Sequence, residues 1–168
     1  MDQEYIYPYW DDIINAKGHK NLQINFDAMS PFAEINLDVT IWNQLRQYEQ
    51  AARLTRNSKF AAVCGRYYEA RFIDAYGIGS LLEGAPIDGA VPDVPGHHIR
   101  SRKPHWLMNP HSGFTRPIYF EMKKMRYSTR RCYFNYRNVA AITKYNGVYI
   151  GATIHPTLPK IIYRFALP

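Results

Sequence analysis

The chain has 168 residues, of which 21 are Lys or Arg and 14 are Asp or Glu, so its formal net charge is +7. With 46% hydrophobic and 15% aromatic residues, and no apolar run near the ~18 to 20 residues of a membrane helix, it is neither a disordered polycation nor a membrane protein. Cys64 and Cys132 stand 68 residues apart, which excludes a disulfide-dense scaffold and a cysteine-rich zinc module and indicates an intracellular, cytoplasmic location.

The first 57 residues predict a mixed segment. A short helical pattern covers Trp10–Ala16, and Asn21–Phe26 alternates apolar and polar residues in the manner of a strand. Helical spacing returns over Asp38–Arg56, with Asp38 or Thr40 as the cap. The pattern leaves open whether residues 1–57 form an arm, a dimerisation or DNA-contacting surface, or part of the core.

The second part of the chain begins with a longer predicted helix, Ser58–Tyr76, which Gly77 ends. An apolar stripe on this helix is expected in the core and consists of Phe60, Val63, Cys64, Tyr67 and Phe72. Residues 77–117 are rich in proline and glycine and predict loops, with short extended pieces at Ile87–Val94 and Trp106–Met108.

Regular periodicity returns near the end of the chain. The predicted elements are a strand at Pro117–Arg126, a helix at Tyr133–Tyr145, and strands at Val148–Ile154 and Lys160–Leu167. A helix followed by strand, helix, strand and strand predicts an α/β domain with a mixed central sheet flanked by helices.

The charge is divided unevenly between the two parts of the chain. Residues 1–93 hold 8 basic and 13 acidic side chains, whereas residues 94–168 hold 13 basic and 1 acidic. In the second part arginines alternate with aromatic residues from Arg126 to Arg137, a combination that suits phosphate contact and base stacking. We therefore expect a nucleic-acid partner, and the alternative is a solvated basic face without a partner.

The single acid of the second part, Glu121, lies in the predicted strand two residues before Lys123. Because strand side chains alternate, the two should share one face about 6 to 7 Å apart along the strand, while Ile118, Phe120 and Met122 face the core. Such a pair at a surface can hold a divalent cation and place an ammonium beside metal-activated water. The alternative is an ordinary solvated ion pair.

Upstream of this pair, Pro92-Asp93 precedes Glu121-Met122-Lys123 by 27 intervening residues. This pattern, together with the order of helices and strands, resembles the PD-(D/E)XK nuclease superfamily, the fold class of many type II restriction endonucleases. The resemblance covers residues 58–168 and implies a restriction-endonuclease-like core there, behind an N-terminal helical segment.

The resemblance implies Mg²⁺ as cofactor and a role for each matching residue. Asp93 and Glu121 would be metal ligands, and Lys123 would position the attacking water or help to deprotonate it. Asp88 is the alternative metal ligand, with 32 intervening residues. Glu69 would be the accessory acid of the leading helix, and its alternative is a surface carboxylate paired with Arg66 or Arg71.

The implied function is a Mg²⁺-dependent, site-specific endonuclease of the restriction type that hydrolyses double-stranded DNA as a homodimer, with homing or junction resolution as further alternatives. The competing class is a viral or architectural protein that binds nucleic acid without catalysis. Candidate contacts to nucleic acid are the basic side chains Arg100, Arg102, Lys103, His105, Lys124, Arg126, Arg130, Arg131 and Arg137.

Two weaker nuclease patterns are also present. His97-His98, Asn109 and His111 are similar to the histidines and asparagine of His-Asn-His nucleases, but a helix does not follow them in the predicted pattern. Tyr149-Ile150-Gly151 is similar to part of the GIY-YIG motif, but the chain after it has no acidic residue. We therefore expect polar loop histidines and an ordinary strand.

Overall fold

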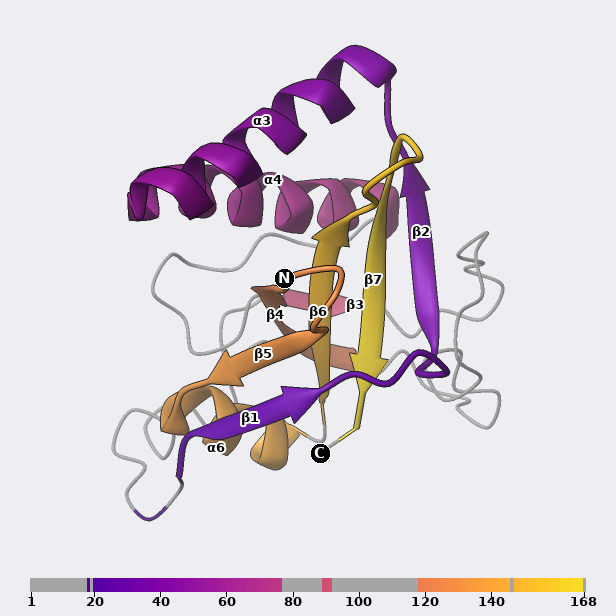
Figure 1. The fold of residues 1–168 in the computed structure, drawn as a ribbon. Helices are drawn as coiled ribbons and strands as arrows, with labels where there is room; N and C mark the ends of the chain where they lie inside the picture. Colours follow the sequence, from indigo (N-terminus) through magenta and orange to yellow (C-terminus); the bar gives the residue numbers. More distant parts are fainter. Residues whose placement is uncertain (1–17, 19, 77–88, 92–117, 146, 168) are drawn as a thin grey trace.

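The computed structural model describes residues 18, 20–76, 89–91, 118–145 and 147–167. The elements in these ranges follow one another as β1 (Leu22–Asn25), β2 (Phe32–Asn36), α3 (Val39–Thr55), α4 (Ser58–Tyr76), β3 (Gly89–Val91), β4 (Ile118–Lys124), β5 (Arg131–Phe134), α6 (Tyr136–Tyr145), β6 (Val148–Ile154) and β7 (Lys160–Ala166) (Figure 1). The predicted helix at Trp10–Ala16 and the extended piece at Trp106–Met108 lie outside the described residues.

The main sheet is mixed and has five strands in the order β2-β7-β6-β4-β3. Strands β4 and β6 are parallel, with Glu121 opposite Tyr149, and the other neighbouring pairs are antiparallel. Parallel neighbours need a crossover, and here the crossover contains β5 and α6. The predicted α/β class, a mixed sheet with helices, is confirmed.

Local signals explain the bounds of the two long helices. Asp38 caps α3, because its carboxylate accepts a 2.8 Å hydrogen bond from the backbone N–H of Thr40, and Arg56 ends the helix in a left-handed conformation with φ 53°. Helix α4 has the predicted bounds and buries Cys64, Tyr68 and Phe72 at four-residue intervals. Val63 was predicted to lie in the core, but it is 39% exposed, because the buried stripe passes through the next residue, Cys64.

The two faces of the main sheet are covered by different layers. On one face α3 and α4 pack over even-numbered residues of β4 and β6, and Phe72 lies 5.3 Å from Phe120 and 5.0 Å from Tyr163 between ring centroids. On the other face the two-stranded β1–β5 sheet and α6 form a second core cluster, in which Phe134 lies 4.7 Å from Tyr149 (Figure 1). Strand β4 is thus covered on both faces.

The described part of the N-terminal segment belongs to these cores. Strand β2 is an edge of the main sheet and pairs with β7, and β1 pairs with β5. Among the described helices, none has the length and apolar character needed to cross a membrane.

Candidate functional site

Glu121 is buried in the middle of β4. Phe120 and Met122 face the α3–α4 core with 0% and 7% of their surfaces exposed, as expected. Glu121 was expected at a surface, but only 3% of it is exposed, and that expectation is wrong. Glu121 is buried because of the tertiary structure: the second core cluster covers the face of the sheet that carries Glu121 and its register partner Tyr149.

Lys123 extends from this buried position toward solvent. Its Nζ atom lies 3.5 Å from Oε1 of Glu121, and the exposed fractions of the two side chains are 39% for the lysine and 4% for the glutamate. Because an ionised carboxylate this deeply buried needs a compensating positive charge, the ammonium stabilises the charged form. The pair is therefore not the solvated surface ion pair that the alternative hypothesis required.

The aspartates proposed as metal ligands, Asp88 and Asp93, lie outside the described residues, as do Arg100, Arg102, Lys103 and His105. Strand β3, which lies between the two aspartates in the chain, pairs with β4, with Gly89 opposite Phe120 and Val91 opposite Ile118. Within the described residues no group of three or more His, Cys, Asp or Glu side chains is gathered closely enough to hold a metal ion.

Glu69 is half-buried on α4. Its neighbour Tyr68 packs into the core on the face of the sheet that carries Phe120 and Met122. Glu121 points from the opposite face, because strand side chains alternate. The fold therefore places these two carboxylates on different sides of β4.

A second charged cluster, absent from the sequence-based candidates, lies on the α3 side of β4. The Nζ atom of Lys124 lies 2.8 Å from Oε2 of Glu49, and the Tyr68 hydroxyl donates a 2.9 Å hydrogen bond to Oε1 of the same carboxylate. Lys124 is also one of the candidate contacts to nucleic acid, and in the structure its ammonium is paired with Glu49. The sequence carries no local signal for a pair separated by 75 residues.

The groups around Glu49 are held in their protonated forms. Burial, reinforced by the Glu49 charge, raises the pKa of the Cys64 thiol to about 12 and moves the pKa of the Tyr68 phenol well above its ordinary value. A thiol with such a pKa contains almost no thiolate at neutral pH, so Cys64 is not a nucleophile there. The cluster fixes α3 and α4 to β4.

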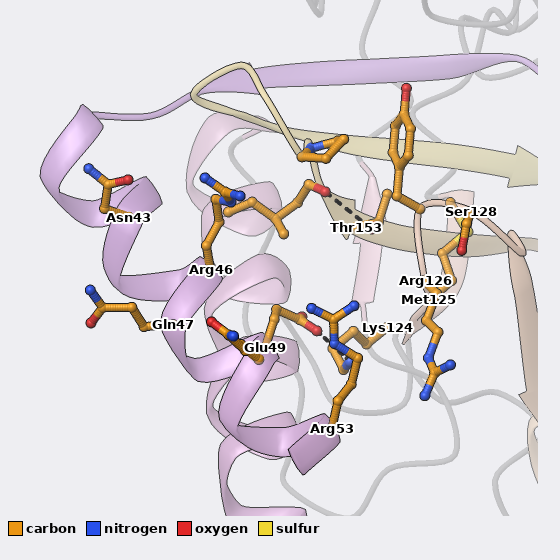
Figure 2. A pocket seen from close by; sticks show the side chains of 14 residues that line it. Asn43, Arg46, Gln47, Glu49, Arg53, Lys124, Met125, Arg126, Ser128 and Thr153 are labelled. Atoms are coloured by element: carbon orange, nitrogen blue, oxygen red, sulfur yellow. Dashed lines mark hydrogen bonds and ion pairs between the residues drawn. The ribbon is translucent and has the colours of Figure 1, made fainter.

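A pocket of about 610 Å³ opens beside this cluster, between α3 and the turn that connects β4 to β5 (Figure 2). Figure 2 shows Arg46 and Arg53 on the helix side and Arg126 on the turn side. Of its lining residues, only Glu49 is acidic, and the others are Asn43, Arg46, Gln47, Gln50, Arg53, Lys124, Met125, Arg126, Tyr127, Ser128, Thr153, Ile154 and Pro156. The pocket is thus cationic and rich in hydrogen-bonding groups.

The remaining basic candidates differ in their surroundings. Arg126, Arg131 and Arg137 are exposed, and the guanidinium of Arg137 lies 5.9 Å from the centre of the Tyr136 ring. Arg130 instead stabilises the β4–β5 turn. Its backbone adopts a left-handed conformation with a φ of 49°, and its side-chain Nε donates a 3.0 Å hydrogen bond to the Phe26 carbonyl. Tyr149-Ile150-Gly151 lies within β6 and is an ordinary buried strand, while the histidine-rich segment is outside the described residues.

No model of a protein family, no curated protein and no solved structure matches this chain significantly.

Proposed function

We propose that the protein is a Mg²⁺-dependent endonuclease that hydrolyses phosphodiester bonds of duplex DNA, with Glu121 and Lys123 in its active site. One observation carries the proposal. A glutamate whose side chain is 4% exposed lies in the middle of a sheet, with a lysine ammonium 3.5 Å away that reaches solvent. A buried carboxylate is costly, and a binding role for a cation explains why one is retained here.

The chemistry of this pair suits a divalent cation. Mg²⁺ prefers oxygen ligands and is bound in proteins through one or two carboxylates, and Glu121 supplies a carboxylate in the middle of β4. When bound, the ion lowers the pKa of water and stabilises negative charge on the phosphoryl group. Lys123 would orient the attacking water and hold a positive charge beside it, while Glu121 would hold the ion in place.

The order of strands around the pair also supports the proposal. Strand β3 runs antiparallel to β4, and the chain then passes through the short strand β5 and helix α6 to β6, which is parallel to β4. The PD-(D/E)XK resemblance implies this succession: a strand near the aspartate, the strand with Glu121 and Lys123, a helix, and further strands. We propose a restriction-endonuclease-like core on this basis.

The second carboxylate would be Asp93, with Asp88 as the alternative, and both lie outside the described residues. Glu69 is left out of the proposed site, because α4 covers the other face of β4.

The site would act within a homodimer on a symmetric sequence, since a chain of 168 residues with one such site cuts both strands most simply as a pair. Restriction is the proposed role, and homing or junction resolution is the alternative for the same chemistry.

Plasmid cleavage tests the proposal. Purified protein with Mg²⁺ should nick or linearise supercoiled DNA, EDTA should prevent cleavage, and Glu121→Gln and Lys123→Met should each reduce the rate at least ~100-fold. Lys59→Met, on the exposed surface of α4, is the control and should cleave as the wild type does. Comparison of Asp88→Asn with Asp93→Asn assigns the second carboxylate. Cleavage that survives in Glu121→Gln, or a wild-type protein inert with Mg²⁺ and Mn²⁺, would refute the proposal.

A second candidate is a protein that binds nucleic acid without cutting it. The arginine-lined pocket of Figure 2 favours it, because this pocket lies on the other side of β4 from Glu121. This candidate predicts binding that weakens steeply with salt, ignores Mg²⁺ and is unchanged in Glu121→Gln.

A further inference from the structure

Two hollows on the surface meet at the start of the β4–β5 turn. The first is the pocket of about 610 Å³ beside α3, and the second has a volume of about 390 Å³ and lies next to β5. Both are lined by Lys124, Met125 and Arg126. The second hollow extends to Arg131 and Tyr133, so the two adjacent hollows together, called the depression, reach from α3 to the outer face of the β1–β5 sheet.

The charges along this depression leave an excess of cations. The Glu49 carboxylate forms an ion pair with the Lys124 ammonium at 2.8 Å and accepts a hydrogen bond from the Tyr68 hydroxyl at 2.9 Å. Arg46 and Arg53 on α3 and Arg126 on the turn form no ion pair with any described residue. Planar guanidinium groups match the geometry of phosphate oxygens, so the walls suit a ligand with several phosphates.

The position of Arg46 is supported by its neighbours. Its guanidinium lies 4.7 Å from the centre of the Trp42 ring, and the Trp42 Nε1–H in turn donates a 2.9 Å hydrogen bond to the His155 carbonyl. An arginine stacked on a fixed ring loses less conformational freedom when it binds an anion.

Exposed aromatic rings accompany the arginines. Tyr127 lines the pocket beside α3 and is 41% exposed, and Tyr133 lines the second hollow and is 70% exposed. Tyr133 shares the outer face of the β1–β5 sheet with exposed amides, since its register partner is Gln23 and that of Arg131 is Asn25. Rings, arginines and amides on one surface are the combination that binds unpaired bases and the phosphates between them.

We propose that this depression is a binding path for a single strand of nucleic acid, with phosphates on Arg46, Arg53, Arg126 and Arg131 and a base stacked on Tyr133. A duplex fits the observations less well, because its base faces are covered by neighbouring base pairs and are inaccessible to an exposed ring. The path lies away from Glu121 and does not depend on the hydrolytic chemistry proposed above.

Fluorescence anisotropy in EDTA tests this path without interference from cleavage. The probes are a labelled single-stranded oligonucleotide as DNA and as RNA, and the blunt duplex of the same sequence. We expect the single strand to bind more tightly than the duplex, with an affinity that falls linearly with salt on logarithmic scales. Inorganic phosphate at matched ionic strength should not displace it, because a lone phosphate engages only one part of the path.

Variants separate the path from net charge. Arg46→Ala/Arg53→Ala should weaken single-strand binding at least ~10-fold and reduce the salt slope. Lys59→Ala/Arg66→Ala removes the same charge from exposed positions on α4 outside both hollows, and should change the affinity less than ~2-fold. Tyr133→Ala should weaken binding about 5- to 100-fold, and Tyr133→Phe should retain it.

Three results would overturn the proposal. They are equal loss of single-strand binding in the two double variants, full single-strand binding by Tyr133→Ala, and a loss of duplex binding in Arg46→Ala/Arg53→Ala and Tyr133→Ala as large as their loss of single-strand binding. Circular dichroism of each variant confirms that it is folded. Because the assay contains no divalent metal, its outcome is independent of plasmid cleavage, and either proposal can fail while the other stands.

Discussion

The ammonium of Lys124 lies 2.8 Å from the Oε2 atom of Glu49, and this ion pair joins strand β4 to helix α3. The preceding residue, Lys123, turns to the other face of β4 and approaches Glu121. Because side chains alternate along a strand, two successive lysines serve two different carboxylates on opposite sides of the sheet. One pair borders the arginine-lined pocket, and the other forms the proposed active site.

The Glu49–Lys124 pair should contribute measurably to stability. The two side chains are 16% and 22% exposed, so the loss of either partner leaves a partly buried charge. Glu49→Gln and Lys124→Met should each lower the free energy of unfolding by about 1 to 3 kcal/mol. In a double-mutant cycle followed by urea unfolding, the combined loss should be smaller than the sum by about 1 kcal/mol. Additive losses would mean that the pair has no net coupling.

Gly151 lies next to the proposed active site, at a position where close packing leaves no room for a side chain. It is the register partner of Lys123, and a Cβ atom there would lie 2.7 Å from both the Met125 Sδ and the Phe26 Cε2 atoms. Gly151→Ala should therefore lower the free energy of unfolding by about 1 to 3 kcal/mol.

Gly65 is the matched control for this substitution. It lies inside helix α4, and a Cβ atom added there would have nothing within 4 Å, so Gly65→Ala should raise the free energy of unfolding by about 0.5 to 1 kcal/mol. Chemical denaturation of both variants measures the two effects. A shift of stability in the same direction by the two alanines would contradict the close packing around Gly151.

The two thiols should be unreactive in the folded protein. Burial raises the pKa of Cys64 and of Cys132 to about 12. At pH 8, Ellman's reagent should therefore label neither in native protein and both in guanidinium, because the thiolate is the reacting form. The folded pKa values exceed the ordinary value of 9.0, so the buried, protonated thiols contribute to the stability of the fold. This contribution is complete below pH 9 and is lost as the pH rises toward 12. Rapid labelling of the native protein would contradict the observed burial.

His155 should make the β6–β7 turn sensitive to acid. Its Nδ1 atom accepts hydrogen bonds from the backbone N–H groups of Thr157, at 3.1 Å, and Leu158, at 2.9 Å, and can do so only when unprotonated. Burial and the Lys160 charge lower its pKa below the ordinary 6.5, against an opposing effect of Glu34.

The folded pKa is depressed, so the stability that His155 contributes is present above pH 6.5 and is lost as the pH falls through the folded value. The Tm of the wild type should decline over this window, and that of His155→Ala should be lower at pH 8 and nearly flat from pH 7 to pH 5. An unchanged decline in the variant would assign the pH dependence to other groups.

Much of the secondary structure followed from local patterns. Helix α4 and strand β6 have the predicted bounds, and the ends of α3, β4 and β7 differ from theirs by at most two residues. Strands β2 and β5 were missed. The predicted helix Tyr133–Tyr145 begins later, at Tyr136, since Arg131–Phe134 pairs with β1, a long-range contact that has no local signal.

The sequence by itself determined where most of the helices and strands form, because caps and the 3.6- and 2-residue periods act within one element. It also identified Glu121 as the exceptional acid of a basic region. Only the tertiary structure decided that Glu121 is buried, that Lys124 pairs with Glu49, and that Arg46 and Arg53 from the acidic half of the chain face Arg126. Each of these depends on which layer covers which face of β4, and that is decided by contacts between residues far apart in the chain.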